Sequence, residues 1–565
     1  MRLPLLLLLL PLAACTQDPF SRMNPYHYSA QKEIVVPHGA VVSAHPLASQ
    51  AGVLILQQGG NAVDAAIATQ LALAVVYPGA GNLGGGGFLV SHLSNGKNIA
   101  IDYREKAPAG AGRDMYLDST GQANPKLSQD GHLAVGVPGS VAGFFAALRY
   151  AKLPMAQLIA PAITLAEKGF AITEAEARNL NAHAAHFRQL NTRPNAFEKD
   201  RPWKAGDTLI QPDLANTLKR IRDKGQAGFY EGPTAQMITE EMQRGHGLIT
   251  PADLKAYQAK ERTPVVFNYK GYTIITMPLP SSGGVALQQM MGMVEGYPLA
   301  SWGFHSTMAT QLMVEVERRA YADRAQFLGD PDFVKVPVQQ LTSQKYLQAR
   351  MQDYDPRKAG SSAVVKAGNV APESEETTHL SVMDSKGNAV AVTTTLNGSY
   401  GSKVVVAGAG FFLNNEMDDF SAKPGVPNMY GLVGAEANAI APGKRMLSSM
   451  TPTIVLKSGR PYVVTGTPGG ATIITSVFQT LMNILEFNLP ADSAVNAPKF
   501  HHQWLPDQVD VEPRFPDSTV TALEHLGYKV VRRGPIGRTE VIKLNAQGQL
   551  EAVGDHRGDD SAAGY

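Results

Sequence analysis

The stretch that decides the fold is TTHLSVMDSKGNAVAVTTTLN, residues 377–397. Its two runs rich in Val and Thr, 378–383 and 389–396, alternate in part between apolar and polar residues, as half-buried strands do. The residues between these runs, 384–388, read Asp-Ser-Lys-Gly-Asn, and such residues favour a tight turn. The stretch therefore predicts a β-hairpin that begins at two threonines.

The register of this hairpin is expected to bring polar side chains together at its open end. With a two-residue loop at 386–387, Thr377 lies opposite Leu396 and beside Thr395 and Asn397. A threonine hydroxyl is a weak nucleophile, but a threonine that heads a chain carries its own general base, an α-amine with a pKa of roughly 7.7 to 8.0. Thr377 is a candidate nucleophile once the bond before it is cut.

Other glycine-rich segments mark further turns. A second hairpin is expected over residues 453–465, followed by Gly466-Thr467-Pro468-Gly469-Gly470 and by a helix that begins near Ala471. Upstream, helical spacing over residues 38–70 is broken by Gly59-Gly60, which predicts two helices. Residues 82–88 contain four consecutive glycines and are expected to form a loop, in which glycines permit positive φ and close backbone approach.

Composition excludes several classes of protein. The chain has 565 residues, of which 44% are hydrophobic and 18% charged, so it can build a large core and lacks the polar bias of a disordered protein. Its net charge is +1 and it has no long basic run, so nucleic acid is not an expected partner. We find no Gly-x-Ser-x-Gly, no His-Glu-x-x-His and no Cys/His cluster, so no serine-hydrolase or metal site is predicted.

The N-terminus is typical of an export signal. Met1-Arg2 precedes an apolar run over residues 3–12, which is too short to span a bilayer as a helix. Leu12-Ala13-Ala14-Cys15 resembles a bacterial lipobox, in which cleavage before Cys15 is followed by lipid attachment to its sulfur. An ordinary secretory signal is the alternative. Cys15 is the single cysteine, so the rest of the chain has neither a disulfide nor a thiol nucleophile.

From about residue 41 to the C-terminus the chain resembles the γ-glutamyltransferases, which belong to the N-terminal-nucleophile hydrolases. The motifs that carry this resemblance occur in the family's order: Gly59-Gly60-Asn61-Ala62-Val63-Asp64-Ala65-Ala66, the tetraglycine segment, Asp102-Tyr103-Arg104-Glu105, Thr377-Thr378-His379, Leu413-Asn414-Asn415-Glu416-Met417-Asp418-Asp419-Phe420, Leu447-Ser448-Ser449-Met450, Gly466-Thr467-Pro468-Gly469-Gly470 and Ala563-Gly564-Tyr565.

The resemblance implies an α+β fold, a four-layer αββα sandwich built from two chains that autoproteolysis produces. The expected segments are a lipoprotein signal peptide (1–14), a tether (15–36), a large subunit (37–376) and a small subunit (377–565) that begins with the catalytic Thr377. The two subunits are expected to form a heterodimer with one joint active site.

The resemblance also implies a role for each site residue. Thr377 is the nucleophile, Thr395 orients its hydroxyl, and the amides of Gly469 and Gly470 stabilise the oxyanion. The α-carboxylate of a γ-glutamyl donor would be bound by Arg104, Ser448 and Ser449, and its ammonium group by Asn397, Glu416 and Asp419. Residues 423–435 are rich in Pro and Gly and resemble the lid of many family members, with Tyr430 as its one aromatic residue.

The expected reaction is attack of Thr377 on the γ-amide of glutathione or another γ-glutamyl compound, with water, an amino acid or a dipeptide resolving the acyl-enzyme. No cofactor is required. Two alternatives remain open, an acylase of the same fold that acts on glutaryl or cephalosporin side chains, and a non-catalytic exported binding lipoprotein. The expected location is the periplasm, with a lipid anchor in the outer membrane. His501-His502 is interpreted as packing, not as a metal pair.

Overall fold

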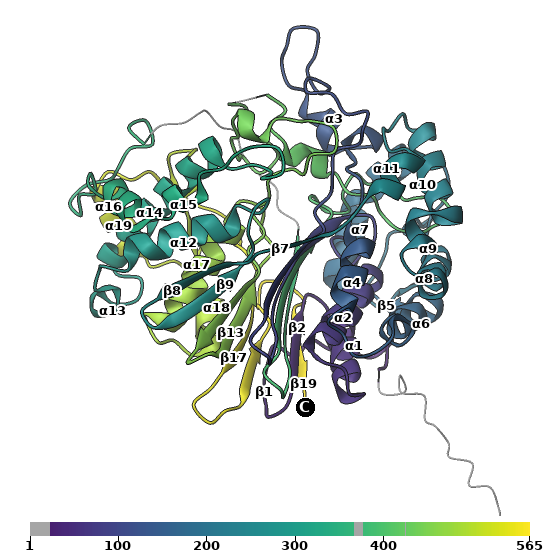
Figure 1. The fold of residues 1–565 in the computed structure, drawn as a ribbon, viewed down its shortest axis with the longest axis horizontal. Coiled ribbons are helices and arrows are strands. Elements are labelled where there is room, and N and C mark those ends of the chain that lie inside the picture. Colours follow the sequence, from purple (N-terminus) through teal and green to yellow (C-terminus); the bar gives the residue numbers. More distant parts are fainter. Residues whose placement is uncertain (1–22, 366–376, 424) are drawn as a thin grey trace, which may run out of the picture.

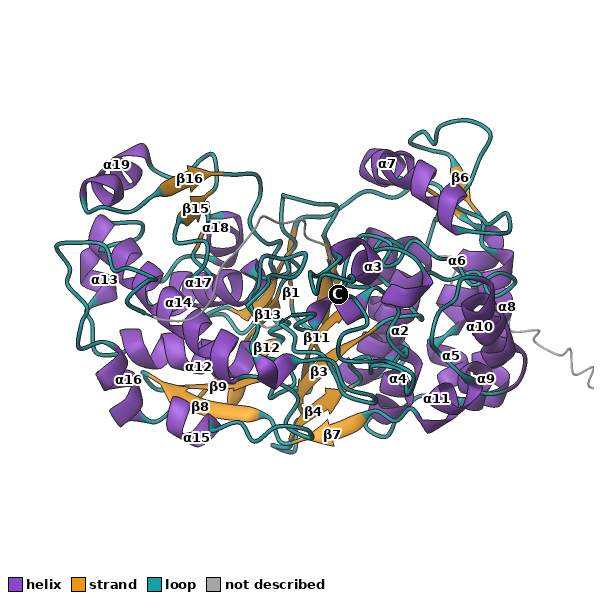
Figure 2. Cartoon of the chain, turned by 90° about the horizontal axis from the view of Figure 1, so that it is seen from above, coloured by secondary structure: helices purple, strands orange, loops and turns teal. Residues whose placement is uncertain are grey.

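The computed structural model describes residues 23–365, 377–423 and 425–565. Two seven-stranded antiparallel sheets lie face to face at its centre, and helices cover the outer face of each sheet (Figure 1). A view at right angles shows the same order of layers (Figure 2). The four-layer αββα sandwich expected from the family resemblance is therefore confirmed.

Sheet 1 contains the hairpin that starts after Thr377. Its strands lie in the order β19 (Ser561–Gly564), β2 (Ala40–Ser43), β10 (Thr378–Met383), β11 (Ala389–Thr395), β3 (Gly86–His92), β4 (Asn98–Asp102) and β7 (Lys260–Arg262). Sheet 2 has the order β1 (Glu33–Val36), β18 (Leu550–Val553), β17 (Glu540–Leu544), β13 (Arg460–Gly466), β12 (Thr453–Lys457), β9 (Tyr272–Thr276) and β8 (Val265–Tyr269). The apolar side chains between the sheets form one continuous core.

Each sheet has its own set of helices. The helices on the side of sheet 1 are α1 (Pro46–Gln57), α2 (Ala62–Val76), α3 (Pro125–Gln129), α4 (Ser140–Leu148), α5 (Met155–Leu158), α6 (Ala160–Lys168), α7 (Glu174–Leu190), α8 (Pro212–Lys224), α9 (Ala227–Tyr230), α10 (Gly232–Arg244) and α11 (Pro251–Ala256). Those on the side of sheet 2 are α12 (Gly283–Val294), α13 (Leu299–Trp302), α14 (Thr307–Phe327), α15 (Val338–Leu341), α16 (Gln344–Arg350), α17 (Thr472–Leu485), α18 (Ala491–Asn496) and α19 (Asp517–His525).

The predicted break between the first two helices is confirmed, but residues 40–43 form strand β2, so the first helix begins at Pro46 and not near residue 38. Gly59 has a φ of 94°, which favours glycine, and it follows the end of α1. Asn61 then caps α2: its side chain accepts from the amides of Val63 and Asp64, and the Asp64 side chain accepts from the Asn61 amide. The second hairpin is also confirmed, since β12 and β13 pair and α17 begins at Thr472.

The predicted register of the first hairpin is wrong by one residue. Thr378 pairs with Thr394 and Met383 with Ala389, so this register, extended by one residue, would set Thr377 opposite Thr395 and not opposite Leu396. The loop is longer than expected because the Asp384 side chain accepts from the amides of Lys386 and Asn388. Gly387, with a φ of 80°, supplies the left-handed residue that such a three-residue loop needs.

The tetraglycine segment is only partly a loop. Gly86 and Gly87 begin β3, so the expected loop is wrong for this half of the segment, and none of Gly84 to Gly87 uses the positive φ that glycine permits. The expected close approach is confirmed: a Cβ on Gly85 would lie 2.1 Å from the carbonyl oxygen of Thr395, and one on Gly87 would lie 2.5 Å from that of Thr393. The glycines thus allow this segment to pack directly on the strand that carries Thr395.

Candidate active site

Ten of the eleven predicted catalytic and substrate-binding residues line one cavity. They come from segments far apart in the sequence: Arg104, Thr377, Thr395, Asn397, Glu416, Asp419, Tyr430, Ser448, Ser449 and Gly470. Leu432, Met450 and Ile473, which the sequence did not single out, complete the lining. The eleventh residue, Gly469, directly precedes Gly470. The cavity volume is only about 20 Å³, roughly the room that one water molecule needs.

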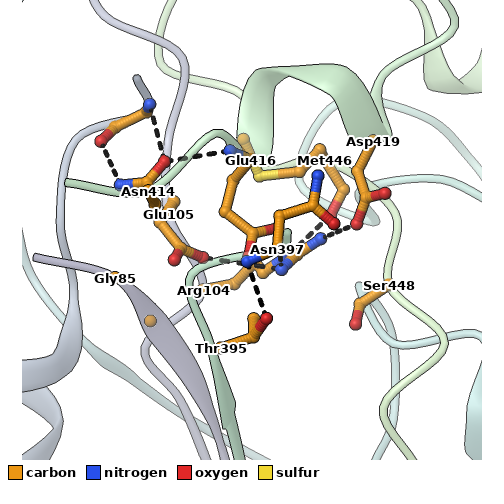
Figure 3. A network of polar contacts seen from close by, with 12 residues as sticks. Gly85, Arg104, Glu105, Thr395, Asn397, Asn414, Glu416, Asp419, Met446 and Ser448 are labelled. Atoms are coloured by element: carbon orange, nitrogen blue, oxygen red, sulfur yellow. Dashed lines mark hydrogen bonds and ion pairs between the residues drawn. The ribbon is translucent and has the colours of Figure 1, made fainter. Parts of the chain in front are cut away.

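Thr377 lies at the start of β10, with 4% of its surface exposed. Two neighbours fix the strand opposite it. The Asn82 side chain donates to the Thr395 carbonyl at 2.9 Å. The Thr395 hydroxyl accepts from the Asn397 amide at 2.7 Å (Figure 3). Asn397 has a φ of 76°, so the chain turns sharply there. Thr377 and Thr395 line the same cavity, as an orienting role for Thr395 requires.

Arg104 lies at the centre of a buried cluster of charges. It follows β4 closely, and a short 3₁₀ helix, Glu416–Asp419, presents two carboxylates to it. Its Nη1 pairs with Glu416, its Nη2 pairs with Asp419, and its Nε donates to the Met446 carbonyl at 3.3 Å (Figure 3). The residues predicted to bind opposite ends of a donor thus neutralise each other in the closed cavity.

The cluster contains more acid than base. Burial raises the pKa of Glu105 to about 8 against the opposing effect of Arg104. Burial also raises the pKa of Glu416 well above its usual value, and that of Asp419, again opposed by Arg104. Burial would lower the pKa of Arg104, but Glu416, Asp419 and Glu105 outweigh burial and raise it. The cluster therefore holds a fixed cation and at least one carboxyl proton near neutral pH.

The paired glycines occupy the turn between β13 and α17. Gly469 has a φ of 135° and Gly470 a φ of 51°, conformations that side chains rarely adopt. The Gly469 carbonyl accepts from both the amide and the hydroxyl of Thr472, at 2.9 and 2.8 Å, which ties it back to the helix. A Cβ on Gly470 would lie 2.4 Å from the Tyr430 ring, so only glycine fits there.

Tyr430 belongs to the segment expected to form a lid, of which Pro424 lies outside the described residues. Its ring is buried, and its hydroxyl donates to the Asn397 carbonyl at 2.5 Å. The Asn428 side chain donates to Asp419 at 3.0 Å, and the Met429 amide donates to Asp418 at 2.8 Å. The segment is therefore closed over the cavity and bonded to its acidic side.

Two polar residues next to the cavity were not identified from the sequence. One is Asn428, and the other is the buried Arg324, whose Nη2 donates to Ser449. Asn428 looks like an ordinary turn residue, and Arg324 lies in a charged run that is typical of a solvated helix face. His501 and His502 are buried, and their side chains bond to Thr475, Gln503 and Asp507. In the described part of the chain no group of side chains could hold a metal ion.

Comparison with known proteins identifies the family. A family model described as gamma-glutamyltranspeptidase matches residues 48–565. The chain belongs to the γ-glutamyltranspeptidase family. It is 47% identical over 550 residues to the glutathione hydrolase proenzyme of Escherichia coli (strain K12), which covers 96% of this chain and 95% of that relative.

Acylases are also relatives of this member of the γ-glutamyltranspeptidase family. The acylase ACY 1 proenzyme of Pseudomonas sp. (strain V22) is 37% identical, with 92% of both chains covered. The solved structure of a cephalosporin acylase from Bacillus halodurans superimposes with a TM-score of 0.82 at 26% identity, covering 96% of this chain and 98% of that one. The fold is thus shared by γ-glutamyl and acylase branches, and the polar lining of the cavity has to distinguish them.

Proposed function

We propose that the chain is a γ-glutamyltransferase and glutathione hydrolase. The observation that carries this proposal is the presence of a threonine nucleophile beside both a cationic and an anionic group in one cavity. A γ-glutamyl donor has an α-carboxylate, an α-ammonium group and an amide to be cut, so it needs all three. Glutathione hydrolases are also among the relatives with the higher identity.

Maturation precedes catalysis in this proposal. The Thr377 hydroxyl attacks the carbonyl carbon of Glu376, the peptide nitrogen leaves as the free amine of Thr377, and water hydrolyses the resulting ester. This sequence leaves a new carboxylate on Glu376 and a new α-amine on Thr377. The amine then serves as the general base for the same hydroxyl.

The second reaction acts on the donor. The Thr377 hydroxyl gives its proton to the α-amine and attacks the γ-carbonyl, and the oxyanion is stabilised by the amides of Gly469 and Gly470. The leaving amine takes the proton, and a γ-glutamyl ester remains on Thr377. Water, an amino acid or a dipeptide resolves this ester. The donor's zwitterionic end replaces the internal pairs, its carboxylate binding Arg104 and its ammonium group binding Asp419.

An acylase is the second candidate, because of the close superposition on a cephalosporin acylase. A glutaryl group keeps the carboxylate but lacks the amine, so it gives no role to the Asp419 side of the cavity. Purified protein should release aniline from a γ-glutamyl anilide, faster with a dipeptide acceptor, and should act more slowly on the glutaryl anilide. Faster turnover of the glutaryl compound would favour the acylase instead.

We further propose a periplasmic lipoprotein anchored in the outer membrane. Cys15 and the rest of the signal lie outside the described residues, and support comes from the lipobox-like Leu12-Ala13-Ala14-Cys15 alone. Thr16 follows Cys15 where an acidic residue would favour retention at the inner membrane. Fractionation should find wild-type protein in outer membranes and Cys15→Ala released or unprocessed. A wholly soluble periplasmic wild type would refute lipidation.

A further inference from the structure

Arg324, in the last turn of α14, is a buried cation without a carboxylate partner. Only 5% of its surface is exposed, and no carboxylate of the described residues lies within ion-pairing distance of its nitrogens. Other arginines of the same helix are paired, Arg318 with Asp507 and Arg319 with Glu315. A buried charge without an opposite partner is strongly destabilising, so a structural reason for this arginine is expected.

The hydrogen bonds of Arg324 converge on the two predicted carboxylate-binding serines. Its Nη2 donates to the Ser449 hydroxyl at 3.2 Å. Its Nε donates to the Ser282 hydroxyl at 2.9 Å, and that hydroxyl donates onward to the Ser448 carbonyl at 2.6 Å. One guanidinium thus holds both serines, one directly and the other through Ser282.

These bonds also set the direction in which the serine hydroxyls can donate. The Ser449 hydroxyl accepts from Arg324, and the Ser448 hydroxyl accepts from the Met450 amide at 3.1 Å. No described residue accepts from either hydroxyl, and both serines line the cavity. Each hydroxyl therefore has its proton available for the cavity, and two convergent donors suit an anion. A hydroxyl that accepts from a cation is also a stronger donor.

The charge of Arg324 complements this arrangement. Arg104 is already paired with Glu416 and Asp419, so its positive charge is largely neutralised within the protein. Burial lowers the pKa of Arg324, but it remains a guanidinium at any physiological pH. Its positive charge lies directly behind the hydroxyl of Ser449. Asp419 acts on Arg324 electrostatically from beyond ion-pairing distance, but it is itself paired with Arg104. A carboxylate bound by the two serines would add a counter-charge on the cavity side of the Ser449 hydroxyl.

We infer that Arg324 is a positioning residue for the donor α-carboxylate: it orients the Ser449 hydroxyl as a hydrogen-bond donor, holds the backbone of Ser448 through Ser282, and supplies a positive charge behind the bound anion. This inference rests on the proposed γ-glutamyl function and adds a second cation to carboxylate recognition. Arg324 itself is separated from the donor by the serine hydroxyls.

Three anilides separate carboxylate recognition from ammonium recognition. The γ-glutamyl anilide has both groups, the glutaryl anilide has only the carboxylate, and the 4-aminobutanoyl anilide has only the amine. In Arg324→Gln, kcat/KM for the two carboxylate donors should fall roughly tenfold to a hundredfold, mainly through KM, relative to the 4-aminobutanoyl donor. Equal losses on all three donors, or no loss on any, would overturn the inference.

Further variants guard against a merely structural effect. Arg324→Lys keeps the positive charge but loses the planar guanidinium, which can bond two hydroxyls at once. Ser282→Ala removes only the hydrogen bonds that link Arg324 to the Ser448 carbonyl. Both variants should therefore lose kcat/KM on the two carboxylate donors, but less than Arg324→Gln does. If Arg324→Gln does not fold, these two decide. Arg319→Gln removes a paired arginine of the same helix and should leave donor preference unchanged in folded protein. The proposed function is tested separately, by whether the wild type prefers the γ-glutamyl anilide.

Discussion

Asp419 accepts from Arg104 and from Asn428 in the closed cavity. This carboxylate therefore connects the cationic group of the site to the lid. The bond to Arg104 satisfies two charges that would otherwise be buried alone, at a cost of several kcal/mol each. A donor whose ends carry the same two charges can replace it with little net change in buried charge. In the proposed function the pair is therefore the closed form of a site for a zwitterion.

Asp419→Ala tests the ammonium role at this scale. Without the carboxylate, a donor ammonium group is left unpaired in a confined site, and kcat/KM for the γ-glutamyl anilide should fall on the order of a hundredfold. The glutaryl anilide has no amine and should lose far less. Steady-state kinetics on both donors measures the difference. Equal losses would show that Asp419 maintains the cavity without recognising the amine.

The neighbouring Asp418 predicts a dependence of stability on pH. Burial raises its pKa from 3.8 to about 6, against the opposing bonds from Ser128 and the Met429 amide. The folded state therefore holds this proton more tightly than the unfolded state, so stability is lost as pH rises from about 4 to about 6, by roughly 3 kcal/mol for this group.

Asp418→Asn removes that titration and can keep both hydrogen bonds, since an amide oxygen can accept from Met429 and the amide nitrogen can donate to Ser128. Thermal unfolding of both proteins from pH 4 to pH 8 gives the comparison. The wild-type midpoint should fall relative to that of the variant as pH rises to about 6. Parallel curves would contradict the raised pKa.

Among the elements, the first hairpin shows which features the sequence predicts and which it does not. Alternation and turn residues were sufficient to locate its strands, but the register depended on Asp384, whose side chain lengthens the loop by bonding two backbone amides. That competition between side chain and backbone is invisible to a strand pattern. The correct register strengthens the site, because, extended by one residue, it would set Thr377 opposite Thr395.

Helix α14 contains charged residues whose burial the sequence did not predict. Its charged residues from Glu315 to Arg324 are buried, because they form ion pairs or hydrogen bonds with one another and with distant segments. Local pattern cannot distinguish a solvated charged face from one that packs against loops hundreds of residues away. For the same reason the motifs located Ser449 but not Arg324 behind it.

The lid permits a prediction for a whole element. Deleting residues 425–434 removes Tyr430 and the Asn428 contact with Asp419, so water enters the site and weakens its charge contacts. Self-cleavage should persist, KM for the γ-glutamyl anilide should rise about tenfold, and bulkier acyl donors should gain relative activity. Unchanged preference between small and bulky donors in a correctly cleaved variant would mean that the segment is only a connector.

At the scale of the whole molecule, both sheets interleave segments from either side of Thr377. In sheet 1, β2 lies between β19 and β10, and in sheet 2, β12 lies beside β9. Cutting the chain before Thr377 would leave each sheet with strands from two chains. Separating those chains would expose the core between the sheets, which is why a stable heterodimer is expected.

This interleaving predicts that cleavage does not release a subunit. Under native conditions the two fragments should co-elute in size-exclusion chromatography and unfold in one cooperative step. Under denaturing conditions they should separate. A small fragment that elutes alone from folded protein would contradict the shared sheets.

The most direct test of the account is the mass of the purified protein under denaturing conditions, for the wild type, Thr377→Ala and Thr377→Ser. The account predicts that the wild type yields a fragment that runs from Thr377 to Tyr565. Thr377→Ser keeps a hydroxyl and should yield the corresponding fragment more slowly, while Thr377→Ala should remain one uncut chain without activity on the γ-glutamyl anilide. Efficient cleavage of Thr377→Ala at the same bond, or full activity of an uncut wild type, would contradict the claim that Thr377 creates its own N-terminal nucleophile.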